Sequence, residues 1–278
     1  MVVAGQASTK ERVKEIADLR ATTILGTPTY MLMLAATARE MGYDPIKLPV
    51  NKIFCAGEPG ASIPATKKRI EDAWGAKVYD VAGATECPMW AFECIEQKGE
   101  HINEALDYVE VLNRDTYEPA KPGEKGTVVV TSLDRLAMPS VRYDLKDIIV
   151  VSDSKEPCGC GRTWRKFEGG ILGRSDDITK VRGVLFSPSN VEEAVRRIAE
   201  LSDEFELVLS YDARSYEQIL VKVEAKPGNE NNTEAIKKKL EAELQNLTQL
   251  RCDVEFRPYG TLPRYEVKAK RFKDLRKH

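Results

Sequence analysis

Apolar and polar positions follow two different periods in the first hundred residues of the chain. Short apolar runs at 21–28, 51–57 and 76–83 have the length and composition of buried strands. The stretches between them, 29–43 and 63–74, carry apolar residues at helical spacing. Strands that alternate with helices in this way predict a parallel sheet, and therefore an α/β fold.

The segments that follow the three predicted strands are the first candidates for a binding site. Ligands of parallel sheets lie beyond the carboxyl ends of the strands. These segments read "GTPTY" (26–30), "CAGEPGA" (55–61) and "VAGATEC" (81–87). We therefore expect a ligand to contact them.

The pattern changes after residue 104. Val- and Ile-rich strands predict a smaller, mostly β subdomain from 105 to 173. Beyond it the predicted elements follow the order β-α-β-β-α-β, which is a small α+β domain over 174–278. The sequence thus predicts a large domain over 1–173, with βαβ units in 1–104, followed by a small domain.

Two predicted helices begin with the same polar pattern. Ser8 with Glu11, and Ser189 with Glu192, have the S-x-x-E spacing of a capping box. In that motif the serine side chain accepts from the third helical amide, and the glutamate accepts from the serine amide. We therefore expect Ser8 and Ser189 to be the N-cap residues of two helices.

Composition and charge exclude several classes of protein. With 42 basic and 44 acidic residues the net charge is −2, which gives no reason to expect nucleic acid as a partner. The start of the chain lacks a signal-peptide pattern, and the longest apolar run (31–38) is too short to span a bilayer. Six cysteines are too few for a disulfide scaffold, so we expect a cytoplasmic protein whose clustered cysteines bind metal or act in catalysis.

Five motifs occur in an order that resembles the adenylate-forming enzymes. They read "CAGEPGA" (55–61), "VAGATE" (81–86), "VRYDLKD" (141–147), "GRSDDITKVRGV" (173–184) and "LPRYEVKAKR" (262–271). The last two, with the "CGCGRT" loop before them, resemble the phenylacetate–coenzyme A ligase branch, which includes coenzyme F390 synthetase-like proteins. The likeness covers essentially the whole chain.

The resemblance implies a ligase reaction in two steps. A carboxylic acid, here expected to be an aryl acid, attacks the α-phosphate of ATP in the presence of Mg²⁺ and forms an acyl-adenylate. The thiol of coenzyme A then takes the acyl group and AMP leaves. The protein would mainly position the reactants and stabilise developing negative charge. Transfer of AMP to a deazaflavin hydroxyl, as in F390 synthetase-like proteins, is the alternative within the branch.

The resemblance also implies roles for residues in the later motifs. Asp147 matches the aspartate that accepts hydrogen bonds from both ribose hydroxyls, and Arg174 matches an arginine near the nucleotide. Asp176 matches the hinge about which the small domain swings, which is a lid-type step. Lys268 matches the mobile lysine that bridges the carboxylate and α-phosphate oxygens. From the residues alone, Asp147 also suits a turn and Lys268 a solvated basic tail.

The earlier motifs match the rest of the nucleotide site. Glu86 matches the acidic residue that helps to hold Mg²⁺, a cation that prefers oxygen ligands, and Thr85 would lie near the phosphates. Gly57, Glu58 and Pro59 match the segment that lines the adenine pocket. A glycine-rich turn after a strand is the structural alternative for both segments.

Several positions depart from the family pattern. Ala82 stands where an aromatic residue usually stacks on adenine, and Val267 stands where glycine precedes the terminal lysine. Leu145 and Lys146 replace the common threonine and glycine. Tyr30 falls where the family places aromatic residues near the acyl substrate, although packing in a helix core explains it equally well.

The Ser/Thr/Gly-rich pyrophosphate loop of the family has no counterpart in this sequence. The stretch "GQASTK" (5–10) imitates it, but Ser8 and Glu11 favour a helix start. We therefore expect the chain to lack the N-terminal part of the large domain, and to need a separate N-terminal fragment or a homodimer partner. A non-catalytic subunit that keeps nucleotide or acyl binding is the alternative function.

Four side chains form a candidate metal site. The resemblance places Cys94 and His101 in the same β-rich region as Cys158 and Cys160. Three sulfurs and one nitrogen suit a closed, tetrahedral Zn²⁺ site, and we predict a structural zinc here. Separate thiols with a surface histidine are the alternative, and a disulfide between Cys158 and Cys160 is least favoured. The other cysteines are predicted to lie in the nucleotide region and in two cores: Cys87, Cys55 and Cys252.

Overall fold

The computed structural model describes residues 7–152, 157–175, 179–212, 215–265 and 269–276. The chain forms two compact units, 1–176 and 177–278, and each is described by itself. None of the helices in the described segments is long and apolar enough to cross a membrane.

Helix α1 (Thr9–Asp18) begins at the predicted capping box. The Ser8 amide donates to Glu11 Oε2 at 2.7 Å, and the Glu11 amide donates to Ser8 Oγ at 3.3 Å. Val13 and Ile16, one turn apart, are buried in the core of unit 1. The prediction of a helix start at Ser8 is therefore confirmed.

Three parallel strands form the centre of unit 1, as predicted. They pair in chain order, and the register sets Gly26 beside Cys55 and Cys55 beside Asp80. The strands and their connections are β1 (Thr23–Gly26), α2 (Pro28–Glu40), η1 (Pro45–Lys47), β2 (Lys52–Ala56), η2 (Pro59–Ala61), α3 (Pro64–Trp74) and β3 (Lys77–Ala82).

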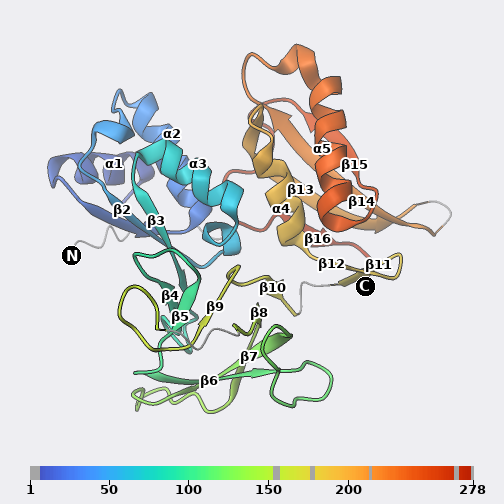
Figure 1. The fold of residues 1–278 in the computed structure, drawn as a ribbon. Helices are drawn as coiled ribbons and strands as arrows, with labels where there is room; N and C mark the ends of the chain where they lie inside the picture. Colours follow the sequence, from blue (N-terminus) through green and yellow to red (C-terminus); the bar gives the residue numbers. More distant parts are fainter. Residues whose placement is uncertain (1–6, 153–156, 176–178, 213–214, 266–268, 277–278) are drawn as a thin grey trace. The chain divides into compact units, whose positions relative to one another are not determined.

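The helices of unit 1 lie over one face of these strands (Figure 1). Ile53 and Val78 from the strands and Ile70 and Trp74 from α3 share this core, with at most 1% of each side chain exposed. Burying a side chain of this size stabilises the fold by about 2–3 kcal/mol. Trp74 also donates from Nε1 to the Met31 carbonyl at 3.0 Å, so its polar atom is satisfied and α3 is tied to α2.

Short antiparallel strands extend the parallel sheet, which the sequence pattern did not predict. They are β4 (Ala91–Glu93), β5 (Glu100–Ile102) and β9 (Lys166–Phe167), and the sheet order is β1-β2-β3-β4-β5-β9. Within this extension Phe92 pairs with His101 and Glu93 pairs with Glu100. A strand from residue 166 thus joins the same sheet as strands that end before residue 103.

A second sheet of unit 1 is wholly antiparallel. Its order is β10-β8-β7-β6, and it corresponds to the predicted β-rich region. Trp90 and Phe167 stack with their rings 5.5 Å apart in a core shared by the two sheets. The strands are β6 (Asp107–Leu112), β7 (Lys125–Ser132), β8 (Tyr143–Val150) and β10 (Gly173–Arg174), and β6–β8 appear in green in Figure 1.

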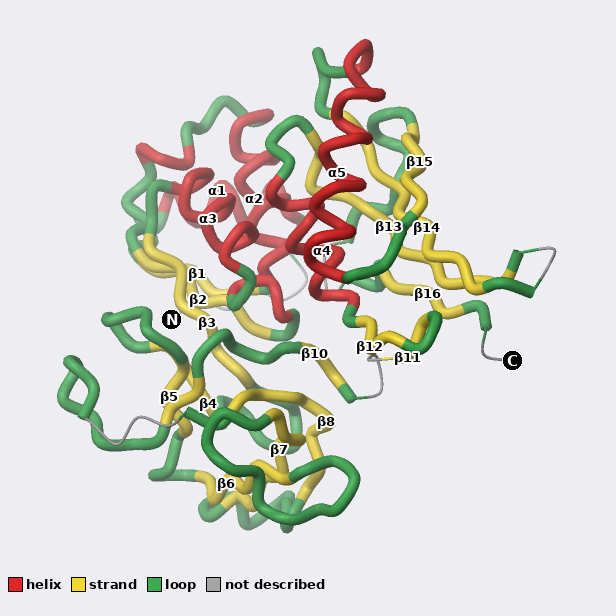
Figure 2. The backbone as a smooth tube through the Cα atoms, turned by 45° about the vertical axis from the view of Figure 1, so that its right-hand side comes forward, coloured by secondary structure: helices red, strands yellow, loops and turns green. Residues whose placement is uncertain are grey.

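Unit 2 is a mixed sheet with two helices on one face (Figure 2). The sheet order is β15-β14-β13-β16, preceded by a separate hairpin of β11 and β12. The helices bury Val191, Ile236 and Leu240 against the strands. The elements are β11 (Thr179–Val181), β12 (Val184–Phe186), α4 (Pro188–Arg197), β13 (Leu201–Tyr211), β14 (Glu217–Ala225), η3 (Glu230–Asn232), α5 (Thr233–Thr248), β15 (Asp253–Arg257) and β16 (Phe272–Asp274).

The predicted capping box of α4 is wrong by two residues. The helix begins at Pro188, its N-cap is Ser187, and the cap makes no side-chain hydrogen bond. Pro188 suits the first helical position because its fixed φ fits the helix and its missing N–H would have no partner there. Ser189 therefore lies inside the helix, where its Oγ is 2.8 Å from Ser187 Oγ.

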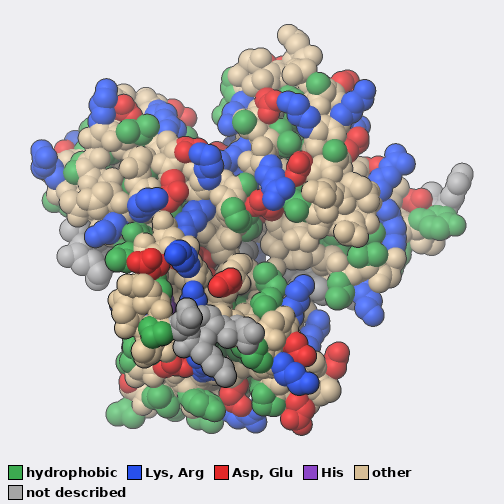
Figure 3. Space-filling model, viewed as in Figure 1, with side chains coloured by type: hydrophobic (Ala, Val, Ile, Leu, Met, Phe, Trp, Pro, Cys, Tyr) green, Lys and Arg blue, Asp and Glu red, His purple; other side chains and the backbone are tan. Residues whose placement is uncertain are grey.

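Charged side chains of both signs are mixed over the face of the molecule shown in Figure 3. This distribution agrees with the net charge of −2.

Candidate active site

The segments that follow β1 and β2 are in contact. A Cβ built on Gly57 would lie 3.7 Å from Thr27 Cγ2, and the φ of Gly57 is +85°, which favours glycine. Glu58 Oε2 accepts from the Thr29 amide at 3.1 Å, at the amino end of α2. A carboxylate is favourable at that position because the helix end carries partial positive charge. Pro59 begins η2.

The predicted magnesium ligand lies in the turn that follows β3. Thr85 is exposed and Glu86 is half-buried. The charge of the Glu86 carboxylate raises the pKa of Tyr143, because it opposes formation of the phenolate. This places the Glu86 side chain beside the first residue of β8. The turn after β3 and the first residue of β8, which belongs to the second sheet, therefore lie at one site.

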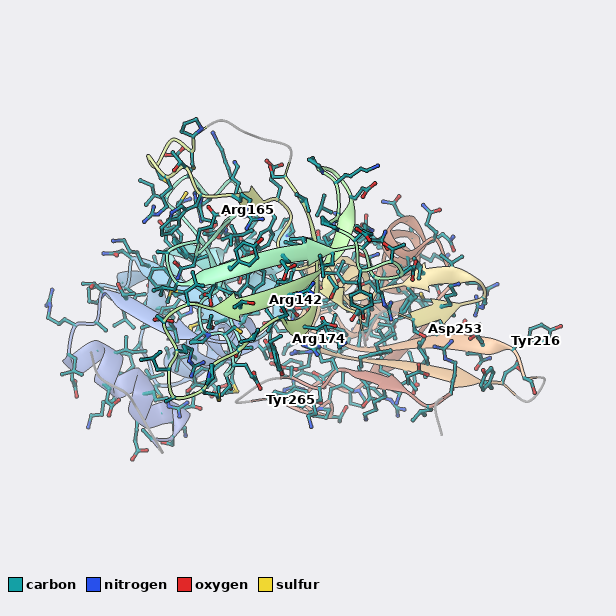
Figure 4. All side chains as sticks on the ribbon, turned by 90° about the horizontal axis from the view of Figure 1, so that it is seen from below. Arg142, Arg165, Arg174, Tyr216, Asp253 and Tyr265 are labelled. Carbon is teal, nitrogen blue, oxygen red and sulfur yellow. The ribbon has the colours of Figure 1, made fainter. Side chains whose placement is uncertain are left out.

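Asp147 and Arg174 are cross-strand neighbours at the same site. They are register partners in β8 and β10, and Asp147 Oδ1 lies 3.7 Å from Arg174 Nη1. Arg174 also donates from Nη1 to the Leu145 carbonyl at 3.1 Å. Arg174 is labelled in Figure 4 together with Arg142, which precedes β8. The two predicted nucleotide residues are thus brought together by strand pairing.

Two departures from the family pattern have a structural explanation. Leu145 is 4% exposed and belongs to the core between the sheets. Lys146 has a φ of +67°, the conformation for which glycine is usually required. Asp144 supports it, because Oδ1 accepts from the Lys146 amide at 2.9 Å and Oδ2 accepts from its Nζ at 2.5 Å. The side chain of residue 144 thus supports the conformation that a glycine adopts freely.

Other predicted site residues are less directly placed. Tyr30 is 7% exposed, with the Arg12 guanidinium 5.2 Å from its ring centre, so it packs between α1 and α2. Ala82 is buried at the end of β3, opposite Ala91. The predicted lysine Lys268, its neighbour Val267 and the predicted hinge Asp176 lie outside the described residues.

The four predicted zinc ligands form one cluster. The ligand atoms of Cys94, His101, Cys158 and Cys160 all lie within 4.8 Å of one another. The Sγ atoms of Cys94 and Cys158 are 3.7 Å apart, and Cys160 Sγ is 3.5 Å from His101 Nε2. A tetrahedral zinc with bonds of about 2.3 Å to sulfur and about 2.1 Å to nitrogen requires edges of about 3.8 and 3.6 Å. Two edges of the cluster match these values, and no other edge exceeds 4.8 Å, so the four side chains suit the ion.

The surroundings of the cluster favour the thiolate at Cys160 and disfavour it at Cys94. The Arg162 amide and guanidinium both donate to Cys160 Sγ, which, against some desolvation, lowers the pKa of that thiol to about 6. The same guanidinium lies 5.3 Å from the Phe92 ring centre and 5.9 Å from that of Trp164. Burial raises the pKa of Cys94 to about 11 when no cation is nearby. A metal ion would offset that desolvation.

The remaining cysteines lie elsewhere. Cys55 and Cys252 are at most 4% exposed and belong to the cores of units 1 and 2 respectively. Cys87 is fully buried in the core between the two sheets, within the turn that carries Glu86. Among the described residues, none of the three joins the four-ligand cluster.

A row of carboxylates that no sequence pattern predicted crosses the first sheet. Asp80 on β3, Glu93 on β4 and Glu100 on β5 stand on neighbouring strands, and Lys67 of α3 is 2.6 Å from Glu93 Oε2. Burial, reinforced by Glu93, raises the pKa of Asp80 to about 7. Both carboxylate oxygens of Glu100 are buried and have no hydrogen-bond partner among the described residues. Buried acids with shifted pKa values are functional-site candidates.

Comparison with known proteins gives this arrangement a family. Residues 183–276 match the model of the AMP-binding enzyme C-terminal domain. The chain is 30% identical to a phenylacetate-coenzyme A ligase of Thermus thermophilus over 97% of its own length and 64% of the relative's. It is 32% identical to a phenylacetate-coenzyme A ligase of Pseudomonas putida, over 94% of this chain and 59% of that one.

A solved structure extends the comparison to three dimensions. A 2-hydroxyisobutyryl-CoA ligase, crystallised in the postadenylation state in complex with R3-HIB-AMP, matches with a TM-score of 0.90 and 28% identity. The match covers 99% of this chain and 59% of that ligase. An anthranilate CoA ligase shares the fold, at 15% identity and a TM-score of 0.67.

Residues 183–276 match the C-terminal domain of AMP-binding enzymes, and the chain is a homologue of the phenylacetate–coenzyme A ligases over nearly its whole length. The predicted resemblance is confirmed. It spans 64% and 59% of the lengths of the two relatives named above.

Proposed function

We propose that the protein takes part in the ATP-dependent activation of a carboxylic acid, through an acyl-adenylate, for transfer to coenzyme A. The observation that carries the proposal is the convergence, within unit 1, of Glu86 with the Asp147–Arg174 pair beside the turns that follow parallel strands. Turns at the carboxyl ends of parallel strands are where nucleotides bind in such folds. Homologues over nearly the whole chain are named as ligases of this kind.

Each residue of this site has a role in the proposed reaction. Asp147 accepts hydrogen bonds from the ribose hydroxyls, and the adjacent Arg174 holds it in position and offers positive charge near the phosphates. The segment of Gly57, Glu58 and Pro59 lines the adenine pocket. These roles need exposed polar groups next to strand ends, and the side chains of Asp147 and Arg174 are 16% and 38% exposed.

Glu86 and Thr85 would face the phosphates with Mg²⁺. A carboxylate oxygen is the ligand type that this hard cation prefers, and Glu86 is half-buried at an accessible turn. Bound Mg²⁺ would neutralise phosphate charge during adenylation. Lys268, proposed to bridge the carboxylate and α-phosphate oxygens, and Asp176, proposed as the hinge for the second step, complete the scheme.

The relatives indicate the chemical class of the substrates. Their names and titles specify phenylacetate and 2-hydroxyisobutyrate, and one structure holds 2-HIB-AMP together with CoA. We therefore propose a small organic acid, with an aryl acid first in the order of testing, and coenzyme A as the acceptor. Adenylyl transfer to a deazaflavin hydroxyl is the alternative acceptor reaction.

Carboxylate-dependent exchange of labelled pyrophosphate into ATP tests the proposal. The purified chain is assayed with a panel of aryl and short aliphatic acids, and active acids are then assayed for coenzyme A thioesters. We expect exchange with at least one acid, and its loss in Asp147→Ala. Binding of AMP without exchange, by the chain alone and after supply of the N-terminal segment of a relative, would favour a nucleotide-binding subunit over a ligase.

We also propose that Cys94, His101, Cys158 and Cys160 hold a structural Zn²⁺. The Cys94–Cys158 and Cys160–His101 distances fit tetrahedral geometry, which supports this proposal. Four protein ligands would also leave no coordination position open for a substrate, as is typical of a structural site. Metal analysis of the purified protein should find about one zinc per chain, and Cys158→Ser should lose it. Cys252→Ser, in unit 2, is the matched control. Equal zinc content in all three proteins would rule the site out.

A further inference from the structure

We propose that Arg135 is a positioning residue: it holds the backbone of the turn between β3 and β4 and thereby sets the direction of the Glu86 carboxylate. The inference rests on the proposed function, because Glu86 acts there on the metal and phosphates. Arg135 lies in the segment between β7 and β8, outside the motifs that resemble the family.

The contacts of Arg135 are with the backbone of two consecutive site residues. Its Nη1 donates to the Thr85 carbonyl at 2.6 Å and to the Glu86 carbonyl at 2.9 Å. The Glu86 carbonyl also accepts from Ser140 Oγ at 3.0 Å. Hydrogen bonds from a charged donor are stronger than neutral ones. Three hydrogen bonds from one segment therefore fix the two peptide units that flank the Glu86 Cα.

Few hydrogen bonds within the turn could orient the Thr85 and Glu86 carbonyls. The Ala84 amide donates to the Cys87 carbonyl at 3.1 Å and closes the turn. The chain also passes close to itself, because a Cβ built on Gly83 would lie 2.8 Å from the Met89 amide nitrogen. The Thr85 and Glu86 carbonyls, in contrast, point at Arg135. Their direction is thus set from outside the turn.

The segment that carries Arg135 is itself anchored. The Ser132 amide donates to the Ser140 carbonyl, and the Leu133 amide donates to the Leu106 carbonyl, each at 2.9 Å. Ser140 is 6% exposed. Arg135 therefore extends from a segment tied to β6 and β7, and can transmit the rigidity of the second sheet to the turn.

Tyr143, at the far end of the same segment, lies beside the Glu86 carboxylate, whose charge raises the pKa of the phenol. The backbone of Glu86 is held by Arg135 and Ser140. A metal ligand requires a defined direction of approach, and a fixed backbone limits the directions that the Glu86 carboxylate can take.

The test uses the full chain with Arg135→Ala, Arg135→Lys and the control Arg114→Ala. Arg114 is an exposed arginine in the connection between β6 and β7, so the control makes the same change in charge. Adenylation rate is measured against Mg²⁺ concentration at saturating ATP and acid. Hydrogen exchange of the peptide covering residues 84–89 is measured alongside, without substrates.

Arg135→Ala should raise the Mg²⁺ concentration for half-maximal rate by about tenfold, leave the KM of the carboxylic acid unchanged, and speed exchange in 84–89. Arg135→Lys should recover part of both effects, and Arg114→Ala should match the wild type. Unchanged Mg²⁺ dependence and exchange in Arg135→Ala would overturn the proposal. An equal loss of rate at all Mg²⁺ concentrations would also overturn it, because that is the result of a merely structural role.

Failure of the proposed function is a separate result. A wild-type protein that forms no adenylate would refute the ligase, and the exchange measurement would then decide the positioning role alone. If Arg135→Ala does not fold, Ser140→Ala replaces it, with a smaller shift expected in the same direction. An unshifted Mg²⁺ dependence in a folded Ser140→Ala would then count against the proposal.

Discussion

Asp147 and Arg174 face each other across the strand pair β8–β10, with Oδ1 and Nη1 3.7 Å apart. Strand register, and not sequence proximity, brings these two residues together. The separation is long for a hydrogen-bonded ion pair, and partly exposed pairs of this kind contribute about 0–1 kcal/mol to stability. The pair therefore costs the fold little if it rearranges around a ligand.

Asp147→Asn should separate binding from stability. The proposed ribose contact makes us expect about tenfold weaker ATP binding, while the free energy of unfolding changes by less than about 1 kcal/mol. Isothermal titration and urea denaturation of the same preparation measure the two effects. Asp115→Asn, in the exposed turn after β6, is the control and should change neither. Unaltered ATP affinity in Asp147→Asn would contradict the assignment.

Removal of zinc should destabilise unit 1. The four ligands come together only in the folded state, so the free energy of zinc binding adds to the free energy of unfolding. A strong chelator should lower the thermal midpoint of the wild type by about 5 °C or more, which corresponds to about 2 kcal/mol. The same chelator should have no effect on Cys158→Ser. Equal midpoints for the wild type with and without chelator would argue against a bound ion.

Asp80 should make the stability of unit 1 fall as pH rises. Its pKa is raised from 3.8 to about 7 in the folded state, mainly by burial. The folded protein therefore binds a proton that the unfolded chain releases, so its stability declines between about pH 4 and pH 7.

Asp80→Asn should remove that decline. We expect the variant to be more stable than the wild type by about 2 kcal/mol or more at pH 8, since each pKa unit corresponds to about 1.4 kcal/mol. The difference should shrink toward pH 4. Urea denaturation at several pH values measures it. Asp72→Asn, on the exposed side of α3, is the control. A constant difference across this range would show that Asp80 is not the titrating group.

The ion pair of Arg264 with Glu224 should be critical for unit 2. The Glu224 side chain is 0% exposed and accepts from both Arg264 terminal nitrogens at 2.8 and 2.7 Å. Arg264→Ala leaves a buried carboxylate with fewer donors, so unit 2 should lose about 3 kcal/mol. Adding Glu224→Gln to that variant should recover part of the loss.

The two units can be followed separately in that experiment. All three tryptophans, Trp74, Trp90 and Trp164, lie in unit 1. Tryptophan fluorescence therefore reports unit 1, whereas far-UV circular dichroism reports both units. Arg264→Ala should shift the unfolding transition of unit 2, which circular dichroism detects, and leave the fluorescence transition of unit 1 unchanged. A shift of both signals by the same amount would mean that the units unfold together.

Local sequence signals predicted the elements that depend on local interactions. The three parallel strands and their helices follow from the period of apolar residues, and the Ser8 cap follows from one side-chain pair. The same motif failed at Ser189, because Pro188 occupies the first helical position and moves the N-cap to Ser187. Local rules conflict there, and the backbone constraint of proline prevails.

Features that depend on pairing over long distances were not predictable. Strands β4 and β5 have three residues each, too few to show a period, and they exist because they pair with β3 and with residues 166–167. The row of Asp80, Glu93 and Glu100 is invisible in the sequence for the same reason. The cluster of Cys94, His101, Cys158 and Cys160 was predictable only because cysteine and histidine are rare in this chain and chemically distinctive.

The hairpin of β4 and β5 separates two kinds of chemistry by one residue. Side chains alternate across a sheet, so Glu93 and Glu100 lie on one face, while Phe92, His101 and the adjoining Cys94 lie on the other. A slip of one residue during folding would exchange the two sets. Four ligands converge on one ion only in the native register, so an ion at this position would stabilise that register against a hairpin paired one residue out of step.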